Sequence, residues 1–193
     1  MTLKIGVLAS QGAFAEHIAS ITKLDTKAVE IRLPAELDGV DGLIIPGGES
    51  TTISLLMNSY DLFSKISSLV KAGLPLFGTC AGMIMMAKNV IGNHSETLGL
   101  MDITVKRNAF GRQVDSFETD LDFPVLGKKP FPAVFIRAPL IVSCASPAEV
   151  LAKLKDGTIV AARQGHLLAT SFHPELTGDL RVHRYFLDIV KRK

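Results

Sequence analysis

The stretch that decides the fold class is Leu74-Pro75-Leu76-Phe77-Gly78-Thr79-Cys80-Ala81-Gly82, followed by Met83-Ile84-Met85-Met86-Ala87-Lys88. Residues 74–78 predict a short strand, because they are mostly apolar and end at a glycine. Residues 83–88 predict the start of a helix. A buried strand that passes through a tight glycine turn into a helix is typical of α/β proteins with a parallel sheet.

The rest of the first half repeats this alternation of strands and helices. Strands are expected over residues 3–9, 27–33 and 42–45. The helix over residues 13–24 would present Phe14, Ile18 and Ile21 on one apolar face. A second helix begins after residues 46–48, where Ser50 or Thr51 would cap it, and a third is expected over residues 61–72.

The second half predicts strands with no helices between them, which favours antiparallel pairing, over residues 101–106, 116–121, 133–136 and 158–163. A strand over residues 166–172 precedes a C-terminal amphipathic helix, and the Pro-rich residues 123–132 are expected to form a surface loop. The predicted fold is a three-layer α/β architecture with a mostly parallel central sheet, helices on both faces and an antiparallel extension in the second half. Because no repeat or linker interrupts the chain, residues 1–193 are expected to form a single domain.

Composition excludes several classes of function. Among 193 residues, 21 Lys and Arg balance 19 Asp and Glu, so the net charge of +2 gives no basic excess for binding nucleic acid. No apolar run reaches the roughly 18 residues of a membrane span. The two cysteines, Cys80 and Cys144, form no disulfide framework or metal-ligand pattern, and Cys144 is expected to be inert. We therefore expect a cytoplasmic protein without a metal or cofactor.

Cys80 is the candidate nucleophile. Residues 78–82 form a G-x-C-x-G turn between a strand and a helix, which has the same logic as the serine nucleophile elbow of hydrolases. The flanking glycines relieve crowding at a strained central residue and let a substrate carbonyl approach the backbone, and the helix N-terminus favours the thiolate form. The alternative is a small buried cysteine whose neighbouring glycines only allow the helix and the strand to pack.

His173 is the candidate general base, and Glu175 is the carboxylate that would orient it. Side chains two apart on an extended chain point the same way, and Pro174 disfavours helical geometry at His173. Alone, His173 would be interpreted as a loop histidine, but together with Cys80 it predicts a thiol nucleophile with its base. The remaining histidines are expected to have no role in catalysis. His17 and His183 lie on predicted helices, His94 lies in a polar loop, and His166 begins a strand.

The candidate oxyanion-binding loop is Pro46-Gly47-Gly48-Glu49-Ser50. Its glycines leave backbone amides unshielded at a strand-to-helix turn, and one such donor typically contributes about 3 kcal/mol of transition-state stabilisation. The amides of Gly47, Gly48 and Ala81 are expected to form the oxyanion hole. The alternative is a plain glycine turn. A phosphate-binding loop is excluded, because there is no G-x-x-x-x-G-K-[ST] pattern and no G-x-G-x-x-G after the first strand.

Taken in order, these three motifs resemble the class I, triad-type glutamine amidotransferases. Further blocks narrow the resemblance, nearly end to end, to the glutaminase subunits of pyridoxal 5'-phosphate synthase: residues 6–13 (Gly-Val-Leu-Ala-Ser-Gln-Gly-Ala), 107–113 (Arg-Asn-Ala-Phe-Gly-Arg-Gln), 135–139 (Phe-Ile-Arg-Ala-Pro) and 171–176 (Ser-Phe-His-Pro-Glu-Leu). The resemblance implies that the chain hydrolyses L-glutamine to L-glutamate and ammonia. The ammonia would pass to a separate synthase subunit of the same complex, a lyase that makes the vitamin B6 cofactor.

The resemblance also implies roles for individual residues. Cys80 would be the nucleophile, His173 the general base and acid, and Glu175 its orienting carboxylate. Glutamine would be contacted by the residues at the family's binding positions: Gly48, Glu49, Ser50, Arg107, Ile136 and Arg137. An arginine suits this role because its planar fork holds a carboxylate through two hydrogen bonds, whereas Arg112 is expected to form only a surface ion pair.

The turn that contains Gln11 is expected to contact the synthase subunit. Ser10 stands where family members usually carry a larger apolar residue, and this departure would affect the partner contact rather than catalysis.

Three other functions remain open. The chain could serve a different ammonia-dependent synthase, act as a catalytically silent scaffold, or be a cysteine peptidase or chaperone-like relative that shares only the elbow. The Arg107 block argues against the first, the complete set of catalytic residues against the second, and the His-Pro-Glu unit against the third. Ammonia release from glutamine, with and without a synthase subunit, would distinguish them.

Overall fold

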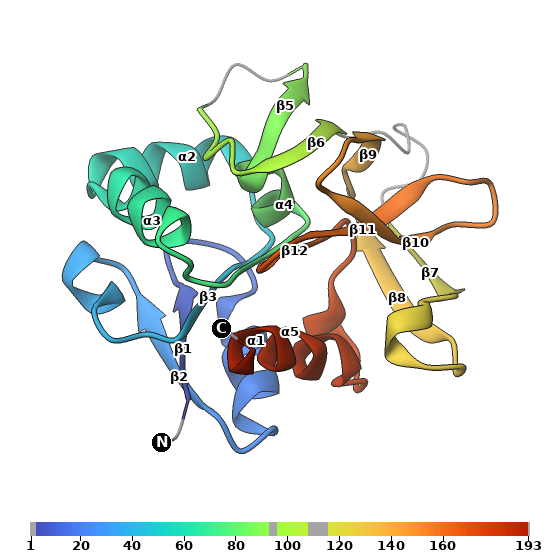
Figure 1. Cartoon of the computed structure of the whole chain (residues 1–193), viewed down its shortest axis with the longest axis horizontal. Helices are drawn as coiled ribbons and strands as arrows, with labels where there is room; N and C mark the ends of the chain where they lie inside the picture. The colour runs from blue at the N-terminus through green and yellow to red at the C-terminus, as the bar shows by residue number, and fades with distance from the viewer. Residues whose placement is uncertain (1–2, 93–95, 108–115, 193) are drawn as a thin grey trace.

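The computed structural model describes residues 3–92, 96–107 and 116–192 (Figure 1). The strands are β1 (Lys4–Leu8), β2 (Lys27–Ile31), β3 (Gly42–Ile45), β4 (Leu76–Thr79), β5 (Ala87–Ile91), β6 (Met101–Lys106), β7 (Ser116–Leu121), β8 (Phe131–Ile136), β9 (Leu140–Cys144), β10 (Glu149–Lys153), β11 (Ile159–Gln164) and β12 (Leu167–Thr170). The α-helices are α1 (Phe14–Thr22), α2 (Ser50–Ser59), α3 (Leu62–Lys71), α4 (Ala81–Met86) and α5 (Arg181–Lys191). The short 3₁₀ helices are η1 (Pro34–Leu37), η2 (Pro124–Leu126) and η3 (Pro174–Leu176).

One long sheet joins the two halves of the chain in the order β2-β1-β3-β4-β12-β11-β9-β6-β5, and β10 pairs with β11 beside this path. The pairs from β2 to β12 are parallel. From β12 to β6 the pairs are antiparallel. The predicted parallel sheet with an antiparallel extension is therefore confirmed. Pairing in the second half is not all antiparallel, however, because β5 and β6 run parallel.

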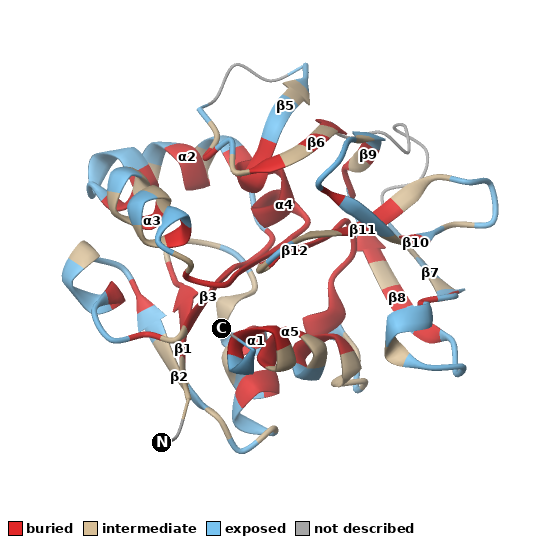
Figure 2. Ribbon diagram, in the orientation of Figure 1, coloured by how far each residue is buried: buried red, intermediate tan, exposed pale blue. Residues whose placement is uncertain are grey.

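Helices cover both faces of this sheet (Figure 1). α2, α3 and α4 pack on one face through side chains such as Ile53 and Ile66, and α1 and α5 pack on the other through Ile21 and Phe186. The β7–β8 hairpin extends the second layer. Figure 2 shows the inner sides of the helices and the central strands buried, which removes apolar surface from water and stabilises the fold. No helix in the described part of the chain is long and apolar enough to cross a membrane.

Helix α2 begins with a different cap from the predicted one. Its N-cap is Glu49, whose carboxylate accepts hydrogen bonds from the amides of Thr51 (3.1 Å) and Thr52 (2.7 Å). Ser50 is already the first helical residue, so the prediction of Ser50 or Thr51 as the cap was wrong. A carboxylate satisfies the first free amides of the helix and also interacts favourably with the helix dipole.

Two further segments differ from the prediction. The helix expected over residues 83–88 ends at Met86, and β5 begins at Ala87, because a continuous apolar run shows no periodicity that would mark its end. The Pro-rich residues 123–132 are not a plain surface loop. Phe123 and Phe131 are 1% and 0% exposed, and both pack against Phe172, so this segment contributes to the core.

Candidate active site

Cys80 and His173 lie at the same end of two adjacent parallel strands. β4 and β12 pair with Thr79 opposite Thr170, so both strands end at the same level. Cys80 follows β4 directly, and His173 follows β12 after two buried residues. The carboxyl ends of parallel strands are where open α/β sheets place their binding sites.

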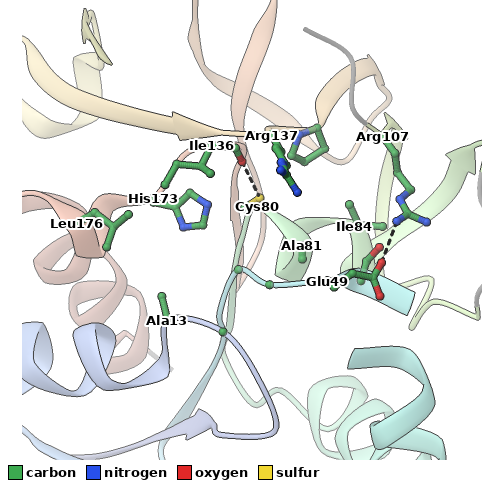
Figure 3. A pocket seen from close by; sticks show the side chains of 15 residues that line it. Ala13, Glu49, Cys80, Ala81, Ile84, Arg107, Ile136, Arg137, His173 and Leu176 are labelled. Carbon is green, nitrogen blue, oxygen red and sulfur yellow. Dashed lines mark hydrogen bonds and ion pairs between the residues drawn. The ribbon is translucent and has the colours of Figure 1, made fainter. Parts of the chain in front are cut away.

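A cavity of about 480 Å³ opens at this edge of the sheet (Figure 3). It is lined by Cys80, His173, the proposed oxyanion residues and every residue at a predicted glutamine-binding position: Gly47, Gly48, Ala81, Glu49, Ser50, Arg107, Ile136 and Arg137. Glu175 is buried and contacts His173, and Gln11 is half-buried beside the loop. Segments from both halves of the chain thus meet around one cavity.

Cys80 has the strained backbone of a nucleophile elbow. Its φ of 49° and ψ of −105° lie where a residue with a side chain is rarely found, and such strain is concentrated at functional sites. Its sulfur lies 3.8 Å from the carbonyl oxygen of Ile136 (Figure 3). Gly82 has a packing role in the same turn, because a Cβ there would lie 1.9 Å from the carbonyl oxygen of Ile45. The turn therefore has the strained geometry expected of a nucleophile, and its glycine also has the packing role of the alternative explanation.

His173 and Glu175 form a short, buried contact. Nδ1 of His173 lies 2.7 Å from Oε1 of Glu175. The expected extended geometry is wrong, however. His173 is not helical (φ −104°, ψ 86°), but Pro174 begins η3, and this 3₁₀ turn brings Glu175 back under the imidazole. Pro174 does keep His173 out of the helix, as predicted.

The surroundings of His173 favour its charged form. Burial alone would lower the pKa of His173, but hydrogen bonds with Cys80 and Glu175, together with the charges of these partners, raise it to about 10. The imidazole is therefore protonated at neutral pH. A protonated imidazole beside the sulfur has a proton ready for a leaving group.

The loop of residues 46–50 packs closely against the candidate catalytic residues, but not in every way that is expected from the sequence. The amide of Gly47 donates a hydrogen bond to Oγ1 of Thr79 (3.1 Å) instead of facing the cavity, so it is not an oxyanion donor in this arrangement. The amide of Glu49 donates to Oε1 of Gln11 (3.0 Å), which makes Gln11 a direct support of the loop. Ala81 is the first residue of α4, so its amide has no partner within the helix.

Glu49 and Arg107 form an ion pair across the mouth of the cavity (Figure 3). Nη2 of Arg107 lies 3.0 Å from Oε1 of Glu49. Partial burial of Glu49 would raise its pKa, but the amides of Thr51 and Thr52 outweigh this and lower the pKa to about 2. The Oγ of Ser50 is buried in the cavity wall and has no hydrogen-bond partner among the described residues. The cavity therefore presents a cation, a carboxylate and a free hydroxyl.

Two histidines for which the sequence predicts no role in the site lie directly behind the candidate catalytic residues. His17 of α1 is 0% exposed, and its Nε2 lies 3.3 Å from Oε2 of Glu175. His183 of α5 is 0% exposed, and its Nε2 lies 2.9 Å from Nδ1 of His17. A sequence signal existed, because His17 lies four residues before the buried Ile21 and so on the inner face of the predicted helix.

The other candidates have structural roles or lie elsewhere. His166 bonds the carbonyl oxygen of Val70 through Nε2 (3.0 Å). Cys144 is half-buried in β9, where burial raises the pKa of its thiol. His94 and residues 108–115, which include Arg112, lie outside the described residues. Within the described ranges, no three His, Cys, Asp or Glu side chains converge in a way that could hold a metal ion.

Comparison with known proteins places this geometry in context. The chain matches the model of the SNO glutamine amidotransferase family over residues 7–192. It is 60% identical over 188 residues to pyridoxal 5'-phosphate synthase subunit PdxT of Moorella thermoacetica, a match that covers 97% of this chain and 100% of that protein. It is also similar to a crystal structure of a glutamine amidotransferase (TM-score 0.92, 48% identity, 97% and 98% of the two chains). A putative GMP synthase component from Thermoplasma acidophilum shares the fold at 19% identity (TM-score 0.71, 100% and 96% of the two chains).

Proposed function

This chain belongs to the SNO glutamine amidotransferase family, and on that premise we propose that it is the glutaminase subunit of a pyridoxal 5'-phosphate synthase. It hydrolyses L-glutamine to L-glutamate and ammonia and supplies the ammonia to a synthase subunit for vitamin B6 synthesis. Cys80, His173 and Glu175 are its proposed catalytic triad. The observation that carries this assignment is the meeting of a strained Cys80 and a Glu175-bonded His173 on the wall of one cavity.

In the first half of the proposed reaction, glutamine acylates the enzyme. The thiolate of Cys80 attacks the side-chain amide carbon, which forms a C–S bond and a tetrahedral oxyanion. The imidazolium of His173 gives its proton to the amide nitrogen, the C–N bond breaks, and ammonia leaves. Glu175 holds the imidazole through Nδ1 and stabilises its charged form, so that Nε2 faces the reacting atoms.

In the second half, water cleaves the thioester. The neutral imidazole of His173 takes a proton from a water molecule as the water oxygen attacks the thioester carbon. When this intermediate collapses, the C–S bond breaks and glutamate leaves. The thiolate and the imidazolium are thereby restored, so protons and electrons balance over the cycle.

The polar groups of the cavity suit the two ends of a free amino acid. Arg107 presents a planar cation to a carboxylate, and Glu49, with its pKa held near 2, stays charged to receive an ammonium group. The buried hydroxyl of Ser50 has no hydrogen-bond partner among the described residues, so a bound substrate would supply one and remove the cost of leaving it unpaired. Gly48, Ile136 and Arg137 complete the proposed glutamine site.

We propose that the synthase subunit docks beside Gln11 and acts through this loop. The amide of Gly47 is turned toward Thr79, which leaves Gly48 and Ala81 as the oxyanion donors of the isolated chain. Because the side chain of Gln11 accepts a hydrogen bond from the amide of Glu49, a shift of the turn that contains Gln11 would move residues 47–49 directly. Ser10 lies in a neighbouring surface cavity with Leu33, Leu56 and Tyr60. Docking there would turn the Gly47 amide into the site and raise the rate of hydrolysis.

Residues 1–193 are proposed to act as one domain in the cytoplasm. The main sheet contains strands from both halves of the chain, which supports a single folding unit. Both cysteines are free thiols, and a catalytic thiol needs a reducing compartment.

The test is ammonia release from L-glutamine by the purified chain, measured alone and with a pyridoxal 5'-phosphate synthase partner subunit. We expect slow release alone, faster release with the partner and, when the pentose and triose phosphates are added, formation of the cofactor. Release that only a different synthase stimulates would show that the chain serves another pathway. Absence of release under all conditions would contradict the enzymatic assignment.

A further inference from the structure

A buried polar cluster lies behind the proposed triad. It consists of His17, Thr79, Glu175 and His183, contributed by α1, β4, η3 and α5, and all four are buried. Nε2 of His17 lies 3.3 Å from Oε2 of Glu175 and 3.2 Å from Oγ1 of Thr79, and its Nδ1 lies 2.9 Å from Nε2 of His183. Burying polar side chains is unfavourable unless they form hydrogen bonds with one another. Apolar side chains would fill this space at a lower desolvation cost, so packing alone does not explain the cluster.

The partners of each atom assign the protons in this cluster. Oε2 of Glu175 has no hydrogen bond of good geometry among the described residues, and Nε2 of His17 is the group that faces it, so Nε2 carries the proton. Nδ1 of His17 is then an acceptor and receives Nε2–H of His183. Nδ1 of His183, which has no partner in the described part of the chain, keeps a lone pair, because a buried unpaired N–H is unfavourable.

Both histidines are neutral in this assignment, and their surroundings agree. Burial, together with the repulsion that a charged His17 would meet from a charged His183 or His173, keeps the pKa of His17 well below its usual value. Burial lowers the pKa of His183 to about 4. The titratable groups that face His17 are Glu175 from η3, His183 from α5 and the adjacent His173, while β4 contributes Thr79 and the ring of Phe77. As a neutral hydrogen-bond donor, His17 supports the Glu175 carboxylate without placing a second positive charge beside it, so His173 remains the charged partner of Glu175.

The same cluster reaches the oxyanion loop. Oγ1 of Thr79 contacts Nε2 of His17 on one side and accepts the amide hydrogen of Gly47 on the other. His17 is therefore the group that touches both the triad carboxylate and the side chain that anchors the loop. A shift of either one changes the hydrogen bonds available to the other.

We propose that His17 is a positioning residue of the glutaminase reaction, which supports Glu175 from behind and couples it through Thr79 to the Gly47 turn. This inference rests on the roles proposed for Cys80, His173 and Glu175. His17 does not touch the substrate. The 3.3 Å contact between Nε2 of His17 and Glu175 is long for a hydrogen bond, so we expect His17 to support the carboxylate chiefly as an electrostatic contact from its ring N–H.

Two substitutions separate the two sides of the His17 ring. In His17→Gln the side-chain amide nitrogen reaches about as far as Nε2 and still faces Glu175, whereas in His17→Asn it reaches only about as far as Nδ1 and faces His183. Both variants are polar and similar in size, so they disturb packing alike. Ile21→Ala, which removes a buried side chain one turn along α1, is the control for simple destabilisation.

The first readout is the separation of kcat from KM for glutamine in the complex with the synthase subunit. We expect His17→Asn to lower kcat about 10- to 100-fold, the range typical of removing an outer hydrogen-bond partner of a functional group, with KM changed little. We expect His17→Gln to retain most of kcat, and Ile21→Ala to lower the melting temperature with little change in kcat. Equal kcat values for the Asn and Gln variants would overturn the proposal.

The second readout does not require glutamine. Side-chain ¹⁵N NMR reports the pH at which the His173 ring loses its proton. This pH should fall in His17→Asn, because Glu175 is then held less firmly against Nδ1 of His173 and stabilises the charged ring less, and it should stay near the wild-type value in His17→Gln. An unchanged titration in His17→Asn would also overturn the proposal. If the wild-type chain releases no ammonia from glutamine, the proposed function fails, but this titration still decides whether His17 supports Glu175.

Discussion

A methyl group on Gly47 would lie 2.3 Å from Cε1 of His173 and 3.3 Å from Cβ of Cys80. The backbone of the loop therefore packs directly against the imidazole, and no side chain fits between them. Glycine is required at this position for close approach, not for an unusual backbone angle. The loop and the proposed base form one packed unit, so the position of each determines the position of the other.

Gly47→Ala is expected to displace the imidazole of His173. A displacement of about 1 Å at a catalytic group costs on the order of 100-fold in rate, so kcat should fall by about that factor. The measurement is steady-state glutaminase activity with the synthase subunit present. Gly178→Ala is the matched control, because a Cβ there meets nothing within 4 Å, and its kcat should be unchanged. Wild-type activity of Gly47→Ala would show that the loop yields instead.

Cys80→Ala is expected to lower glutamine hydrolysis by at least about a thousandfold, because no other group supplies the nucleophile. The free energy of unfolding should change by only about 1 kcal/mol, since little apolar volume is lost. Thermal unfolding and ammonia release measure the two effects. Cys144→Ala, which alters the other free thiol, should keep full activity. Substantial turnover by Cys80→Ala would refute the nucleophile assignment.

Glu175→Gln should impair turnover more than substrate affinity. The amide is neutral and no longer stabilises the imidazolium of His173, although it fills the same space. The expected loss in kcat is about 10²- to 10⁴-fold, with KM for glutamine changed only a few-fold. Steady-state kinetics separates the two parameters. If the change appeared only in KM, Glu175 would be a binding residue instead.

Arg107→Ala is expected to raise KM for glutamine by about tenfold or more, because a charge-assisted pair with the substrate carboxylate is lost. Loss of the ion pair with Glu49 should affect stability little, since both side chains are partly solvated. Arg184→Ala is a suitable control, because Arg184 is an exposed residue of α5 that does not line the cavity. Equal KM values for the two variants would exclude Arg107 from glutamine binding.

The pKa values of His173 and His183 should be shifted in opposite directions from the ordinary value of histidine. With its pKa raised to about 10, the ring of His173 should remain protonated at pH 8, and the stability it contributes should be full below about pH 6.5 and lost as the pH rises toward 10. His183, with its pKa lowered to about 4, should remain neutral at pH 6 and make the fold less stable as the pH falls below 6.5. Side-chain ¹⁵N NMR and unfolding curves from pH 4 to 10 measure both. Titration of His173 near pH 6.5 would contradict the environment described for it.

The strands of the first half and the three catalytic motifs could be predicted from the sequence, because their signals are local. The run Gly42–Ile45 is apolar and ends at Pro46, and the turn at Cys80 carries its glycines beside it. The cap of α2 could not be identified in this way. Ser50 and Thr51 belong to the preferred capping residues, and the choice of Glu49 depends on where the chain turns after β3.

The buried histidines could not be predicted for a different reason. His17 meets both Glu175 and His183 only after α1, α5 and η3 have packed against the same face of the sheet, and no local pattern encodes that meeting. The same holds for Phe123 and Phe131, whose prolines suggested a surface loop. Their burial depends on Phe172, which is distant in the sequence. Local patterns identified the proposed reacting groups, and tertiary packing supplied their support.

The pairing of β4 with β12 also has an evolutionary consequence. Neighbouring strands are held about 4.8 Å apart by their backbone hydrogen bonds, whatever side chains they carry. If a nucleophile follows one of these strands and a base follows the other, the backbone pairing of the strands sets the distance between them. The surrounding loops can then diverge in length and composition. A protein with only 19% identity can accordingly keep the same fold while the loops at the edge of the sheet change in sequence.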